Sequence, residues 1–159
     1  MSRTPTHLAL YIGLLHRSES TLATALRTVG EGHAADADVY YICDLLADWS
    51  DEHVRRLQPM VDKYGEQDPD EPDRLYAEGV PEVRSGPVGL LRDLQDLTLL
   101  ATLVSTSWTA VGQGAQGNRD AELKELADSC SATTNRQLAW LNHRMKQVAP
   151  QALLVSGST

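Results

Sequence analysis

Phenylalanine is absent from this sequence, and aromatic residues make up 5% of its 159 positions. Aliphatic side chains, mainly leucine, alanine and valine, must therefore form most of the hydrophobic core. The sequence also lacks a run of about 18 apolar residues, which a membrane-spanning helix needs. We expect a protein that does not span a membrane and that forms one domain over residues 1–159.

Basic residues are in the minority, with 14 lysines and arginines against 22 aspartates and glutamates and a net charge of -8. This balance disfavours nucleic acid as a partner, because phosphate contacts need clustered lysine and arginine. Cysteine is scarce as well, and Cys43 and Cys130 lie far apart in the sequence. We predict two buried free thiols in a cytoplasmic protein, with a disulfide between two helices as the alternative.

Apolar residues recur at spacings of three and four, which is the period of an amphipathic helix. Helices are predicted over about 5–29, 34–64, 87–111 and 119–148. The segment 65–86 is acidic, contains prolines and has no sustained period, so it is predicted to be a long crossover. The fold class is therefore all-α, a four-helix bundle in which this crossover joins two antiparallel helix hairpins.

Single residues mark the predicted ends of the later helices. Pro87 suits the first position of the third helix, because its missing N–H needs no partner there. The glycine-rich segment 112–118 is predicted to be the turn after that helix. Asn118 is the predicted N-cap of the fourth helix.

Two segments resemble the metal-binding helices of ferritins and bacterioferritins. DEHVRRL, in the second predicted helix, resembles the segment that contains a Glu-x-x-His motif, and His53 falls on the histidine. TNRQLAWL, in the fourth, resembles the bacterioferritin segment in which Glu-x-x-His precedes a Trp-Leu pair. The resemblance implies a ferritin-like bundle, in which two such motifs and two further glutamates bind two iron or manganese ions.

Most of the ligands that this resemblance implies are missing. The histidine at position 53 and a glutamate on the apolar stripe of the first helix, Glu19, are present. Four of the six positions carry other residues: Ser50, Ala101, Thr134 and Gln137. We therefore expect a non-catalytic protein without a cofactor, with an interaction or accessory role on a ferritin-like scaffold whose di-iron ligands are lost.

A rebuilt metal site is the first alternative. His16, Glu19 and His53, with Asp48 nearby, could hold one Fe, Mn or Zn ion in an oxidoreductase or a metal-storage protein. The structural interpretation of the same residues is that His53 partners Glu19, because an unpaired buried carboxylate is costly. Counting residues back from the turn places these two side chains about one to two helical turns apart.

A carrier of a small ligand is the second alternative. Its site would use the interior space of the lost ions, lined by Cys130, Thr134, Gln137 and Trp108. Other polar residues are given no site role. His33 is expected to cap a helix or face solvent, and Asp93 is expected on a solvated or boundary face.

A protein partner is predicted from surplus apolar residues. Each helix of a four-helix bundle needs one apolar stripe, but the second helix has apolar and aromatic residues around more than one face. The residues concerned are Val39, Tyr40, Tyr41 and Trp49. We expect a homodimer or a complex with another protein.

Overall fold

The computed structural model describes residues 7–65 and 78–155, and these residues form four α-helices without a strand. The helices are α1 (His7–Gly32), α2 (Ala37–Tyr64), α3 (Gly86–Gly117) and α4 (Ala121–Leu154). The all-α class predicted from the apolar periodicity is therefore correct. None of these helices is long and apolar enough to cross a membrane.

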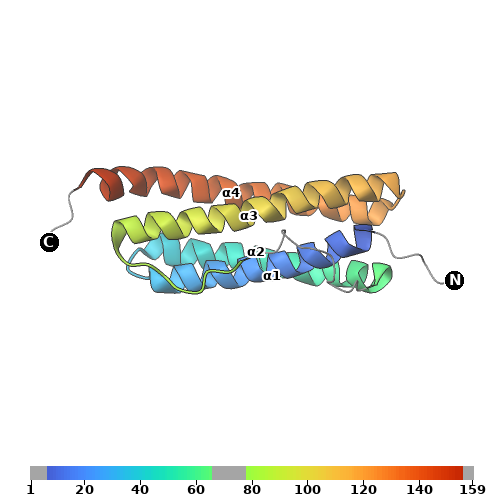
Figure 1. The fold of residues 1–159 in the computed structure, drawn as a ribbon, viewed down its shortest axis with the longest axis horizontal. Helices are drawn as coiled ribbons and strands as arrows, with labels where there is room; N and C mark the ends of the chain where they lie inside the picture. The colour runs from blue at the N-terminus through green and yellow to red at the C-terminus, as the bar shows by residue number, and fades with distance from the viewer. Residues whose placement is uncertain (1–6, 66–77, 156–159) are drawn as a thin grey trace.

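The four helices lie lengthwise beside one another (Figure 1). α1 packs mainly on α2, and α3 packs mainly on α4. α1 also contacts α3, whereas α2 and α4 share few contacts. The chain reverses direction between α1 and α2 and again between α3 and α4, so α2 and α3 run parallel (Figure 1). Parallel neighbours in the sequence require a connection that returns along the length of the bundle.

Aliphatic residues form most of the core, as the lack of phenylalanine requires. Leucines from all four helices are fully buried, and Trp108 of α3 is the largest of the fully buried side chains. Several polar side chains are also buried in the described part of the chain: Ser18, Glu19, His33, Ser50, His53, Asp93, Ser107, Thr134 and Gln137. These polar groups need partners inside the protein, because a buried polar group without a hydrogen bond is costly.

Three of the predicted limits of α3 and α4 are wrong. α3 does not stop at residue 111 but continues through the predicted turn to Gly117. Gly114 packs against the end of the Leu8 side chain, since an added Cβ atom would lie 2.9 Å from Leu8 Cδ1. The N-cap of α4 is Asp120 rather than Asn118, and its carboxylate accepts a hydrogen bond from the backbone N–H of Leu123. α4 in turn extends beyond its predicted end to Leu154.

The last part of the crossover is fixed against the bundle. Within the predicted crossover 65–86, residues 66–77 lie outside the described residues. The segment 78–85 runs along the helices to the start of α3 (Figure 1). At Gly32 the approach is close, because an added Cβ atom would lie 2.7 Å from Val83 Cβ. Val83 of this segment thus packs directly against Gly32 at the end of α1.

Candidate functional site

The centre of the bundle contains a cluster of three polar side chains from three helices. Glu19 of α1 and His53 of α2 are hydrogen-bonded through Oε2 and Nδ1, and both are buried. Trp108 of α3 donates its indole N–H to the same Glu19 oxygen at 3.2 Å. The imidazole and indole rings meet edge to face, with centroids 6.1 Å apart. The predicted pairing of Glu19 with His53 is confirmed, and the count that separated them by one to two turns is wrong.

A second group of polar contacts joins α2 to α4. The side-chain amide of Gln137 donates to the hydroxyl oxygen of Ser50 and to the backbone carbonyl of Leu46, both at 2.9 Å. The Thr134 hydroxyl donates to the carbonyl of Cys130, one turn back in the same helix, at 2.8 Å. Ser50, Thr134 and Gln137 are all fully buried. The residues that stand at the expected ligand positions of α2 and α4 are therefore bonded to the protein itself.

Four buried polar atoms have no hydrogen-bond partner among the described residues: His16 Nε2, Ser18 Oγ, Glu19 Oε1 and Gln137 Oε1. His16 is half-buried and lies one turn before Glu19 on α1. Asp48 lies elsewhere, since its carboxylate contacts Arg27 at 2.8 Å on the surface. Of the four residues proposed as a rebuilt metal site, the structure joins Glu19 to His53 and directs Asp48 to another partner.

A di-iron or di-manganese centre does not fit these residues. Such a centre needs four carboxylates and two imidazoles, whereas the six corresponding positions here supply one of each, in Glu19 and His53. The remaining positions supply a hydroxyl, a methyl group, a hydroxyl and an amide. Within residues 7–65 and 78–155, no group of three or more histidine, cysteine, aspartate or glutamate side chains is arranged to hold a metal ion.

The cysteines add no reactive group to this interior. Cys43 and Cys130 are both buried free thiols. Burial raises the pKa of each thiol to about 12. Since the thiolate is the nucleophile and the metal ligand, both residues are inert at neutral pH. This agrees with the predicted role of the two cysteines in core packing.

A polar cluster that sequence reasoning missed lies where the crossover enters α3. The Asp93 carboxylate contacts His33 Nε2 at 2.7 Å and accepts hydrogen bonds from the backbone N–H and the guanidinium of Arg84, at 3.0 and 2.7 Å. Both His33 and Asp93 are buried, so the predictions of a solvent-facing His33, the alternative to a helix cap, and of a boundary position for Asp93 are wrong. The sequence carried one indication, because Asp93 stands three and four residues from Leu90 and Leu97 on the apolar stripe of α3.

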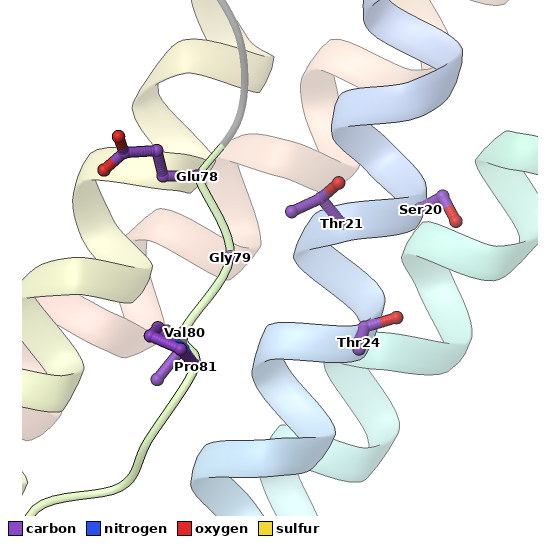
Figure 2. Close-up of a pocket in the computed structure, with 7 residues that line it drawn as sticks. All are labelled: Ser20, Thr21, Thr24, Glu78, Gly79, Val80 and Pro81. Atoms are coloured by element: carbon purple, nitrogen blue, oxygen red, sulfur yellow. The ribbon is translucent and has the colours of Figure 1, made fainter.

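The crossover and α1 enclose a shallow pocket of about 630 Å³ (Figure 2). Its lining consists of Ser20, Thr21, Thr24, Glu78, Gly79, Val80 and Pro81. The Thr21 hydroxyl donates to the backbone carbonyl of Arg17 at 3.0 Å, so it is already engaged within α1. The lining has hydroxyls and one carboxylate but no histidine or cysteine. The described lining therefore offers hydroxyl and carboxylate groups for hydrogen bonds, without an imidazole or a thiol that could serve as a base.

Comparison with known proteins returned no matching family model, no matching curated protein and no matching solved structure. The resemblance to ferritins therefore depends on the sequence around His53, on Glu19 and on the Trp140–Leu141 pair. Function must be argued from the contacts of the interior and of the surface.

Proposed function

We propose that this chain is a non-catalytic, cytoplasmic bundle of the ferritin-like type, in which hydrogen bonds between protein groups replace a di-metal centre. Its role is that of an interaction or accessory protein. One observation carries the proposal: the residues at the expected ligand positions are hydrogen-bonded to one another, in the pairs Glu19–His53 and Ser50–Gln137. Glu19 Oε2 and Ser50 Oγ accept hydrogen bonds from protein donors, which leaves Glu19 Oε1 and Gln137 Oε1 as the acceptors at these positions without a partner among the described residues.

The identity of the donors supports the same proposal. Gln137 uses its amide nitrogen for two hydrogen bonds, and a protonated amide nitrogen is not a metal ligand. The Ser50 hydroxyl accepts one of these bonds. The two buried thiols stay protonated at neutral pH and cannot replace the lost carboxylates as thiolates. Oxygen or redox chemistry at a paired metal centre would require donors that these positions do not provide.

Metal analysis tests the proposal directly. The chain is purified without a histidine tag, incubated with Fe²⁺, Mn²⁺ or Zn²⁺, desalted and analysed by mass spectrometry of the elements. We expect no stoichiometric metal. One or two ions per chain that disappear in the variants Glu19→Gln and His53→Gln would overturn the proposal. Metal that persists in both variants would instead identify binding at surface carboxylates.

A single-ion site is the second candidate, and two orphaned atoms favour it. His16 Nε2 and Glu19 Oε1 are buried, belong to residues one turn apart on α1, and have no partner among the described residues. An Fe, Mn or Zn ion bound to His16, Glu19 and His53 would engage both atoms, in an oxidoreductase or a metal-storage protein. The same metal analysis distinguishes the candidates, because this one predicts a single ion that is lost in His16→Gln.

A further inference from the structure

The N-terminal half of α2 presents apolar side chains to solvent. Tyr41 is 69% exposed, and Leu45, one turn further on, is 44% exposed. Tyr40 is 40% exposed, and its ring meets that of Tyr41 edge to face with centroids 5.1 Å apart. Residues four apart on a helix lie side by side, so Tyr41 and Leu45 form one continuous patch. Apolar patches with polar rims mark sites of protein association.

A row of carboxylates borders this patch. Asp44, Asp48 and Asp51 are spaced four and three residues apart, so they share one side of α2. Each keeps more than half of its side chain exposed. One cation, Arg27 of α1, contacts all three, at 3.5, 2.8 and 2.8 Å. A single guanidinium against three carboxylates leaves two negative charges beside the patch.

We propose that this acidic-aromatic face, made of Tyr40, Tyr41, Leu45, Asp44, Asp48 and Asp51, binds a basic amphipathic helix of another protein. The apolar stripe of such a helix would cover Tyr41 and Leu45, and its flanking lysines or arginines would pair with the carboxylate row. The proposal deepens the proposed function, since it names the partner of an interaction protein. It does not depend on whether the interior holds a metal ion.

Charge distinguishes this partner from a second copy of the chain. In a two-fold dimer the same patch meets itself, so both copies would bring their carboxylate rows to one interface. Like charges across an interface are unfavourable, and the single cation Arg27 cannot neutralise two such rows. A helix rich in lysine or arginine has the opposite sign and encounters no such repulsion.

The probe for this face is a fluorescently labelled synthetic peptide of leucine and lysine, with leucines at helical spacing, measured by fluorescence anisotropy. The comparison peptide replaces every lysine with glutamate. We expect saturable binding of one lysine peptide per chain and no binding of the glutamate peptide. Affinity should fall about tenfold in the double variant Tyr41→Ser/Leu45→Ser. Leu99→Ser on α3 is the matched control, because Leu99 is 70% exposed and the described residues of α3 do not contact α2.

The contribution of charge is tested with Asp44→Asn/Asp48→Asn against the control Glu125→Gln on the exposed side of α4. We expect weaker binding and a shallower salt dependence for the α2 variant alone, since fewer opposite charges are paired. Equal affinity of wild type and Tyr41→Ser/Leu45→Ser, or equal salt slopes for both charge variants, would overturn the proposal. Thermal unfolding of each variant verifies that these surface changes leave the fold intact.

Self-association is the competing occupant of this face. Sedimentation velocity of the chain alone should give a monomer at micromolar concentration. A dimer that Tyr41→Ser/Leu45→Ser dissociates would assign the face to a second copy and overturn the proposal. Neither the peptide titration nor sedimentation reports metal content, so failure here is distinguishable from failure of the proposed non-metal interior.

Discussion

Breaking the buried pair at the centre of the bundle should destabilise the protein more than removing both partners. Glu19 is fully buried and His53 almost so, and the pair has Trp108 as its third member. Substitution of one member, as in His53→Leu, leaves a polar group in an apolar surrounding without its partner. The expected cost is about 3–5 kcal/mol in the free energy of unfolding. At about 2–4 °C per kcal/mol, the melting temperature should fall by roughly 6–20 °C.

The double variant Glu19→Leu/His53→Leu replaces the pair with hydrocarbon. It leaves the Trp108 indole N–H without its acceptor, which costs about 1–3 kcal/mol, and it removes the burial cost of two polar groups. We therefore expect the double variant to be more stable than either single variant, with a coupling free energy of about 2 kcal/mol or more. The exposed pair Glu52–Arg55 is the control, and Glu52→Gln should leave the free energy of unfolding nearly unchanged, because solvent screens an exposed ion pair.

The measurement is urea unfolding followed by far-ultraviolet circular dichroism, with the melting temperature as a second readout. The slope of unfolding against urea must stay constant for the comparison to be valid. Additive effects of Glu19→Leu and His53→Leu would refute the reasoning, because they would mean that the two side chains do not depend on each other. Single-variant costs under about 1 kcal/mol would refute it as well, because a buried unpaired group cannot be tolerated so cheaply.

Two further predictions concern the polar contacts near the ends of the helices. Asp93→Ala removes the acceptor shared by Arg84 and His33 and should cost about 3 kcal/mol; hydrogen exchange should show faster exchange at the Arg84 amide. Hydrogen bonds donated by Lys63 and, to a lesser extent, by Tyr64 lower the pKa of Asp120 from 3.8 to about 2. This carboxylate therefore contributes stability that is present above about pH 4 and is lost as pH falls toward 2. Urea unfolding between these values should give a flatter pH dependence for Asp120→Asn than for wild type.

The number and type of helices were predictable because apolar periodicity is a local property of the sequence. The end of α3 was not predictable from the sequence. Glycine ends helices in many proteins, whereas Gly112 and Gly114 lie within this helix. Gly112 packs toward Ala127, where an added Cβ would lie at 3.4 Å, and Gly114 packs against Leu8. Both neighbours are distant in sequence. No local rule distinguishes a glycine within a helix from one that ends it.

Some polar contacts were likewise predictable from the sequence, and others were not. Glu19 was suspected to be buried because it interrupts an apolar stripe, and the cost of burial made His53 its expected partner. Trp108 is predicted only as a lining residue of a small-ligand site, since nothing local shows that its indole nitrogen meets a carboxylate on another helix. Asp93 was placed at a boundary for a related reason. Its partners His33 and Arg84 come from a turn and from the crossover, whose paths depend on the fold.

The position of the Gln137 contacts explains why polar groups suit this interior better than leucine would. α2 and α4 share few contacts, so apolar packing alone defines their relative position weakly. Gln137 bonds to both the Ser50 hydroxyl and the Leu46 carbonyl, which lie one turn apart on α2. A shift of α4 along α2 would break both bonds and leave a buried amide unpaired, whereas a leucine at this position would permit the shift at little cost. The hydrogen bonds of Gln137 thus fix the register of α4 against α2.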